Sequence, residues 1–484
     1  MAFVCRLLSS PGSPGDASDG SCLYQNLALH LLTAFLSLEE LALEIQTDKS
    51  FLKIAKLLLG IMTVKDNVTS SGNALVCMAS LAATPDGGKR LRASGAIEQL
   101  LGWLEEQTEA PSSGDSEHES NRQKAWHVLE CLLEPTAAPE VVAKAVPTMA
   151  RLMAEGPGIM KLEVLPRLAG VMACMEPPFA EAIQGLGDGW HDSMRTGLLQ
   201  LLQNRLGGEH RRNILTAGLF MCEHAGQEWA IPPLIEGQRF ANGTFVQLLV
   251  SVCKIDLRLR LEEEDRPEDN AQVVPVGLAL VEKALQFLGE GDFDEEEEGG
   301  GGAMQATRNW WSMDPERLLY MKKDLEESTD AVLLYIEDAN EKNALEDPLL
   351  EPMARFLGMW FLEVASDIYV DKLCLALPAL CNPATAAVSP SKSEPIAFLI
   401  PALSALAVED KVLDALLRAD AHAAAARIVL RGVSAPEEDH ALHPAVTLLM
   451  QVFGGRKHGP AAHAGLFAQV LPAVVKCAEG MAKR

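Results

Sequence analysis

Apolar side chains recur along most of the chain at intervals of three and four residues, and short breaks rich in Pro and Gly interrupt them. In the stretch 23–45, for example, Leu27, Leu31 and Phe35 follow one another at intervals of four residues. This spacing places side chains on one face of a helix, whereas a half-buried strand alternates apolar and polar residues. No stretch shows that alternation over a convincing length, so the pattern predicts an all-α chain.

The predicted helices follow one another in tandem, separated by breaks that are often only a few residues long. The segment Thr84 to Gly88 is interpreted as a turn and 108–121 as a polar loop. A tandem series of short helices is typical of an armadillo/HEAT-like α-solenoid with repeats of roughly 40–47 residues. The predicted helices are 23–45, 51–62, 70–82, 90–106, 122–134, 139–154, 159–175, 191–206, 209–224, 244–262, 271–289, 315–339, 348–364, 367–381, 394–406, 409–418, 421–431, 441–453 and 462–481.

One segment differs in composition from the rest of the chain. Glu295 to Glu298 form an unbroken acidic run, and four glycines follow it directly. Such a segment cannot bury apolar surface and should be disordered. The sequence therefore predicts an N-terminal helical lobe over 1–288, an acidic, Gly-rich linker over 289–313, and a C-terminal lobe of the same solenoid over 314–484.

The composition supports a large helical array and limits its partners. Among 484 residues, 48% are hydrophobic but only 5% aromatic, and 67 acidic residues outnumber 41 basic ones to give a net charge of −26. A single compact core stops growing at about 250–300 residues, which favours several domains or an elongated array. The negative charge disfavours nucleic acids and anionic membranes, and favours proteins with basic segments. The acidic excess also has a simpler interpretation, which is solubility.

The cysteines and the absence of a signal segment indicate the compartment. Ten cysteines are spread widely without a Cys-x-x-Cys pair, and most lie in apolar runs, as Cys77 and Cys253 do. Buried free cysteines behave as small hydrophobic residues, and a secreted disulfide framework would be denser. The most apolar long run, 23–45, carries Glu39, Glu40 and Glu44, so no membrane span is predicted. The expected location is the cytosol, with the nucleus as an alternative.

The sequence offers no recognised catalytic motif. Gly-x-Ser-x-Gly, the phosphate-binding Gly loop and His-Glu-x-x-His are all missing, so neither an enzyme nor a bound cofactor or small molecule is expected. His440 and His443 could share a metal, but a closed site needs about four ligands, so no metal site is predicted. Asp292 to Glu298 lack the spacing of a calcium-binding EF-hand loop and are interpreted as solvated.

Two places are candidates for contact with a partner. Trp310 and Trp311 follow the acidic segment, and Trp is frequent at interaction hot spots, although the pair could instead dock the end of the linker on the core. A second candidate is the charged helix end formed by Arg258, Glu262 and Glu263. The alternative interpretation of these residues is a set of surface ion pairs without a binding role. None of the seven Trp residues has Asn four positions later, which argues against the peptide-binding ladder of nuclear-import armadillo adaptors.

Several stretches in collinear order resemble the neurochondrin (norbin) family. The most similar runs from Asn213 to Trp229, includes Glu223-His224-Ala225-Gly226-Gln227-Glu228-Trp229, and continues through 245–250 to the Arg-x-x-Leu-Glu-Glu ending at 258–263. Further similar stretches are 84–95, Arg355-Phe356-Leu357-Gly358-Met359-Trp360 to Glu363, and Leu399-Ile400-Pro401 to Asp410. The resemblance also implies that the family's array extends past both ends of this chain.

The resemblance implies an armadillo-like helical fold without an active site. Animal members of the family are cytosolic proteins of neurons and bone-forming cells that bind receptor tails and a calcium/calmodulin-dependent kinase and promote neurite outgrowth. The expected function is therefore a non-catalytic cytosolic adaptor whose acidic surface selects partners with basic, flexible segments. The alternative is a HEAT-type assembly or transport factor that binds folded protein cargo on a wide surface.

Overall fold

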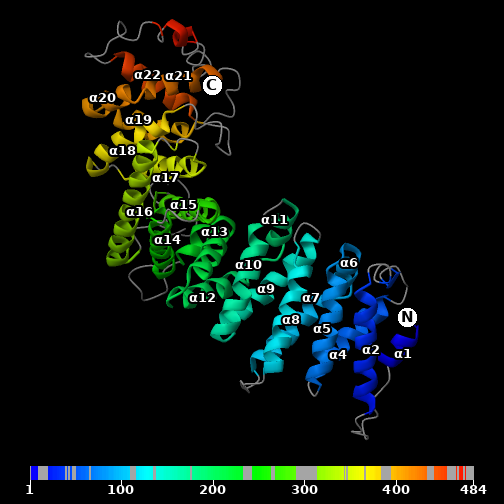
Figure 1. Ribbon diagram of the computed structural model, residues 1–484. Coiled ribbons are helices and arrows are strands. Elements are labelled where there is room, and N and C mark those ends of the chain that lie inside the picture. Colours follow the sequence, from blue (N-terminus) through cyan, green and yellow to red (C-terminus); the bar gives the residue numbers. More distant parts are fainter. Residues whose placement is uncertain are drawn as a thin grey trace, which may run out of the picture. The chain divides into compact units, whose positions relative to one another are not determined.

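A computed structural model gives the fold of the chain. It describes residues 2–8, 20–38, 41, 44–45, 51–64, 67–109, 116–134, 138–174, 177–232, 242–262, 267–289, 313–342, 344, 347–364, 367–382, 394–432, 441–454, 465, 468–472 and 475. Every regular element in these ranges is a helix, which confirms the predicted all-α, armadillo/HEAT-like architecture (Figure 1).

The chain forms two compact units, Met1–Phe220 and Met221–Arg484. The first contains α1 (Ala2–Leu8), α2 (Gly20–Leu36), α4 (Phe51–Met62), α5 (Val68–Ala82), α6 (Pro85–Ala93), α7 (Ala96–Glu109), α8 (Ser116–Leu132), α9 (Pro139–Glu155), α10 (Gly158–Ala173), α11 (Pro177–Gln184) and α12 (His191–Leu202). The boundary falls within α13 (Gly208–Ala230). The second contains α14 (Thr244–Glu262), α15 (Pro267–Gly289), α16 (Pro315–Glu341), α17 (Leu350–Glu363), α18 (Asp367–Leu380), α19 (Ile396–Leu406), α20 (Asp410–Arg418), α21 (Ala421–Gly432) and α22 (Leu442–Gly454).

Helices of the first unit pack in two rows. In one row α2 packs on α5 and α5 on α8, and in the other α4, α7, α9 and α12 follow one another, with α10 and α11 against α9. Helix α2 contains no Asp, Glu, Lys or Arg, and its Leu23, Tyr24 and Leu27 are exposed by 67%, 54% and 50%. Each helix therefore contacts chiefly its neighbours in the stack, as in solenoid proteins.

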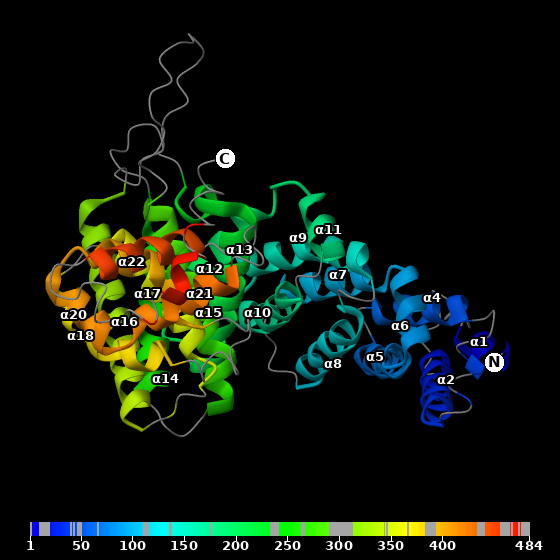
Figure 2. The same cartoon turned by 90° about the horizontal axis from the view of Figure 1, so that it is seen from above.

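Helices of the second unit form two layers. In the first layer α14 packs on α16, α16 on α18 and α18 on α20, and in the second α15 packs on α17, α17 on α19 and α19 on α22. Both views show α16 and α18 side by side (Figures 1 and 2). The 27-residue α16 begins at Pro315, because the Asp314 side chain accepts a hydrogen bond from Glu316 N at 3.0 Å. This layer carries the candidate site described below.

Two glycines allow neighbouring helices to approach closely. A methyl group at Gly358 of α17 would overlap the carbonyl oxygen of Phe398 in α19, and one at Gly197 of α12 would lie 2.7 Å from backbone atoms of Met153 in α9. A side chain of any other residue would push these helices apart. The glycines thus set the inter-helix distance in both units.

Buried tryptophans fill the space between stacked helices. Trp126, Trp190, Trp229 and Trp360 are each at most 4% exposed, and Trp103 is 8% exposed. The interpretation of these five residues as packing residues is therefore confirmed. Because each ring buries a large apolar area, a few aromatic residues suffice for a core otherwise built from Leu, Ala and Val.

Eight of the cysteines are described as free thiols, and five of these are buried: Cys5, Cys77, Cys222, Cys253 and Cys381. Burial raises the pKa of Cys77 to about 11, and it raises the pKa of Cys222 and of Cys381 to about 12. These thiols therefore remain protonated and act as apolar packing groups at neutral pH.

By length and composition α15 could cross a membrane, since its segment Asn270–Leu288 has a mean hydropathy of 1.3. Half of that segment is buried in the fold, where α15 packs against α14 and α17. This burial is typical of a core helix in a stacked array.

Several predicted boundaries were wrong. The predicted turn at Thr84 to Gly88 begins α6, because Pro85 takes the first helical position and its missing N–H is not needed there. The predicted helix 90–106 is broken at Gly95, whose φ of 79° lies in the left-handed region. The predicted loop 108–121 overlaps the end of α7 and the beginning of α8. Most of the predicted helix 462–481 lies outside the described residues.

The predicted lobe boundary at 289–313 stays a prediction, because nearly all of this segment lies outside the described residues. The helices on its two sides, α14 and α15 before it and α16 and α17 after it, pack together in the second unit. Met313, at the end of the segment, is buried against Gly243.

Candidate functional site

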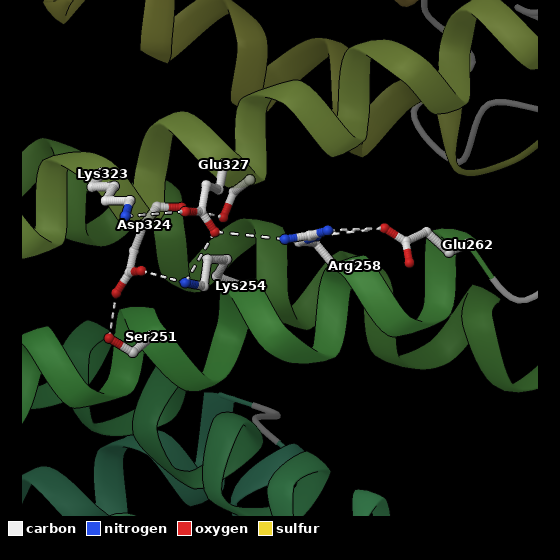
Figure 3. A network of polar contacts seen from close by, with 8 residues as sticks. Ser251, Lys254, Arg258, Glu262, Lys323, Asp324 and Glu327 are labelled. Carbon is white, nitrogen blue, oxygen red and sulfur yellow. Dashed lines mark hydrogen bonds and ion pairs between the residues drawn. The ribbon is translucent and has the colours of Figure 1, made fainter.

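A seam of charged side chains joins α14 to α16 (Figure 3). The Lys254 ammonium donates to the Asp324 carboxylate at 2.6 Å and lies 3.1 Å from that of Glu327. The Ser251 hydroxyl also donates to Asp324, and Arg258 Nη1 lies 3.7 Å from Glu327. We call Ser251, Lys254, Arg258, Asp324 and Glu327 the α14–α16 seam.

Helical spacing explains how the seam forms. Ser251, Lys254 and Arg258 are three and four residues apart and so share one face of α14, as Asp324 and Glu327 share one face of α16. The two helices run in the same direction here, because 251 and 254 meet 324 while 258 meets 327. The cations come from one helix and the carboxylates from the other, which fixes the register of the pair.

Lys254 stays charged in the seam at neutral pH. Burial disfavours the charged form of Lys254, but hydrogen bonds from Lys254 to Asp324 and Glu327, and the charges of these carboxylates, outweigh it and raise the pKa of Lys254. The side chain of Asp324 is only 11% exposed, and the Lys254 ammonium compensates this carboxylate where little water reaches it. The group is suited to holding helices together and not to proton transfer near neutral pH.

Similar ion pairs continue along the same layer. Lys372 of α18 lies 2.5 Å from Asp330 of α16, and Lys411 of α20 pairs with Asp371 of α18. Each joins a cation and a carboxylate on adjacent helices. These outer pairs are more exposed than the seam and contribute less to stability.

The solvent side of α16 combines apolar and acidic side chains. Tyr320 and Leu334 are 54% and 57% exposed. They belong to one helical row at intervals of three and four residues, which we call the α16 face. Its members are Glu316, Tyr320, Lys323, Glu327, Asp330, Leu334, Asp338 and Glu341. Overall α16 carries eight carboxylates against three basic side chains, so the two exposed apolar side chains, about 21 Å apart along the helix, lie in a negative field.

Two of the five predicted contact residues, Arg258 and Glu262, lie at the α14–α16 seam. Arg258 extends the seam, and its Nη2 lies 3.4 Å from Glu262, so both belong to the surface ion pairs that were the alternative interpretation. Glu263, Trp310 and Trp311 lie outside the described residues, and their predicted role stays a prediction.

Sequence reasoning missed Lys254, Asp324 and the α16 face. The signal available was the density of carboxylates between 324 and 341, which was interpreted only as a helix. Lys254 and Asp324 are 70 residues apart in the sequence, so helical periodicity cannot predict their hydrogen bond.

Within the described ranges no group of three or more His, Cys, Asp or Glu side chains is placed to hold a metal ion. Of His440 and His443, at which the sequence predicts no metal site, only His443 lies in the described ranges.

Comparison with known proteins decides the family. The family model described as Neurochondrin matches residues 1–476. The chain belongs to the neurochondrin family. Neurochondrin of Xenopus laevis is 23% identical over 394 residues, which are 79% of this chain and 49% of the relative. This neurochondrin-family chain thus spans about half the length of the curated relative it matches, and the predicted resemblance is confirmed.

Two solved structures illustrate what this neurochondrin-family chain is similar to in the comparison of folds. One comes from a study of a phosphorylation switch in the interaction between cadherin and beta-catenin, with 14% identity, 94% of this chain and 83% of that chain covered, and a TM-score of 0.46. Another is a designed armadillo repeat protein in complex with the peptide (KR)4. It is 14% identical, the match covers 58% of this chain and 98% of the designed chain, and the TM-score is 0.35.

Proposed function

We propose that the chain is a non-catalytic scaffold that binds a basic, amphipathic segment of a partner protein on the α16 face. The observation that supports this most is the row on which Tyr320 and Leu334 are exposed together with the carboxylates of Glu316, Asp338 and Glu341. A segment with Lys or Arg on one side and Leu on the other complements such a face in charge and in apolarity.

The family supports a binding role, and stacked helices leave long faces free for macromolecules. Kinase regulatory segments and juxtamembrane receptor tails have the basic, flexible character that this face requires. We also propose a cytosolic location, which the free, buried thiols of the described cysteines support.

The test uses a fluorescent peptide of about 20 residues built from Lys and Leu in helical amphipathic order. We expect the chain to bind it, and to bind neither the peptide with Glu in place of Lys nor the same composition in scrambled order. Leu334→Ser should weaken binding about fivefold or more, because an apolar anchor is lost. Leu362→Ser in α17 is the matched control, since Leu362 is 49% exposed and lies outside the α16 face.

Charge is tested in the same assay. Glu341→Lys on the α16 face should weaken binding and reduce its dependence on salt, whereas Glu363→Lys at the end of α17 should change it less. Equal affinity of the Lys and Glu peptides would contradict the proposal. If only folded partners bind, and the Leu334 variant binds them normally, the cargo-carrier alternative replaces it.

A further inference from the structure

A groove lies between α18 and α20, at the other end of the same layer. It has a volume of about 500 Å³, within the range of sites that hold a ligand or a peptide side chain. Its lining residues come from the end of α16, from α18, and from α20 with its C-terminal cap. They are Asn340, Asp371, Cys374, Leu375, Pro378, Lys411, Ala415, Arg418 and Ala419.

Small residues create the hollow. Ala415 and Ala419 on the α20 side are buried, and their methyl groups leave the space that larger side chains would fill. Leu375, which is 54% exposed, and the exposed Pro378 form the opposite wall. The middle of the groove is therefore apolar and open to solvent.

The two cations of the groove differ in their partners. Lys411 pairs with Asp371 across the groove. Arg418 uses its Nε to donate to the Asp414 carbonyl oxygen at 3.2 Å, and within the described ranges no carboxylate lies in ion-pair distance of its guanidinium. Lys411 and Arg418 are seven residues apart on one face of α20, which is roughly 10 Å along the helix. The groove thus has a neutralised end and a positive end.

Cys374 lies between these charges and can report on occupancy. Burial and the nearby Asp371 raise the pKa of its thiol, while Lys411 and Arg418 act in the opposite direction. Its side chain is half-buried, so a reagent reaches it from the open groove.

We propose that this groove binds a protein segment in which a large apolar side chain is followed by a carboxylate. The apolar side chain occupies the space over Ala415 against Leu375, and the carboxylate pairs with Arg418. Such a ligand complements the groove in charge, although the chain as a whole carries −26 and repels acidic segments elsewhere. The α16 face selects basic segments, so this site has a different specificity and its test is independent of the proposed function.

The carboxylate can belong to a Glu side chain or to a chain terminus, and three short fluorescent peptides distinguish these. All contain two leucines, followed by Glu with an amidated end, by Gln with an amidated end, or by Gln with a free carboxylate. We expect binding of the first, of the third, or of both, and no binding of the second. Arg418→Glu should weaken binding about tenfold or more, and Arg431→Glu at the end of α21 should leave it unchanged.

The thiol shows where the peptide binds. In the full chain, a bound Leu-Leu-Glu peptide should slow the reaction of Cys374 with N-ethylmaleimide, followed by mass spectrometry, and leave the exposed Cys174 unaffected. If Arg418→Glu does not fold, judged by circular dichroism, Arg418→Gln takes its place. Binding of the Gln amide as tight as that of the tighter-binding carboxylate peptide, or unchanged labelling of Cys374 when that carboxylate peptide is saturating, would overturn the proposal. Either result leaves binding of basic peptides to the α16 face untouched.

Discussion

At the scale of single residues, Gly226 has the most unusual backbone in the described part of α13. Its φ of 71° and ψ of −165° interrupt helical geometry, and this region is open almost only to glycine. The residue stands in the stretch His224-Ala225-Gly226-Gln227, which the sequence shares in pattern with the family. Its role is thus to turn the chain between two helical pieces, and a packing role is not needed, because a methyl group there would meet nothing within 4 Å.

Gly226→Ala should lower the free energy of unfolding by about 1–3 kcal/mol, since the backbone must adopt a strained conformation. Denaturant unfolding followed by circular dichroism measures this. Gly170→Ala is the control, because Gly170 is helical, exposed and without neighbours within 4 Å. There alanine should be neutral or stabilising by a few tenths to about 1 kcal/mol. A Gly226 variant as stable as the control variant would show that the kink is dispensable.

At the scale of elements, the α14–α16 seam joins a helix that precedes the segment 289–313 in the sequence to a helix that follows it. Lys254→Met would leave the Asp324 carboxylate without its closest cation. We expect a loss of about 1–2 kcal/mol, because the pair is mostly buried but still reached by water. Lys322→Met is the control, since Lys322 makes only an exposed pair with Glu326 and should change stability by less than about 0.5 kcal/mol.

The seam also predicts the sign of a pH effect. The pKa of Lys254 in the folded chain is raised above the ordinary lysine value of 10.5, so its stabilisation is complete below that pH and is lost as pH rises through the folded-state pKa. The difference in unfolding free energy between the natural chain and Lys254→Met should therefore narrow above about pH 10.5. A constant difference would mean that the methionine acts through packing alone.

The elements also show what periodicity reveals. Apolar residues that recur at intervals of three and four positions identified most helices, because burial of one helix face is a local property of the sequence. The break at Gly95 and the beginning of α6 at Pro85 were misplaced, since both depend on backbone angles and capping that apolar spacing does not report. The groove over Ala415 was invisible for a different reason: a hollow depends on which helix lies opposite, and a single sequence does not show this.

At the scale of the whole molecule, stacked helices that contact mainly their neighbours should transmit damage only locally. Gly197→Ala disturbs the contact of α12 with α9, and Gly358→Ala that of α17 with α19. Each should cost about 1–3 kcal/mol by forcing helices apart. Hydrogen exchange with mass spectrometry should show faster exchange in α9 and α12 for the first variant and in α17 and α19 for the second. Equal acceleration everywhere in both variants would indicate a single cooperative unit.

The uncharged helix α2 has a consequence for handling the protein. With a charge of −26, copies of the chain repel one another in dilute buffer. This repulsion keeps the exposed apolar residues Leu23, Tyr24 and Leu27 from contacting the same residues of another copy. Added salt shortens the range of that repulsion but does not weaken the apolar contact between copies. Colloidal stability should therefore be greatest in dilute buffers, in which the proposed binding of a basic segment to the α16 face should also be strongest.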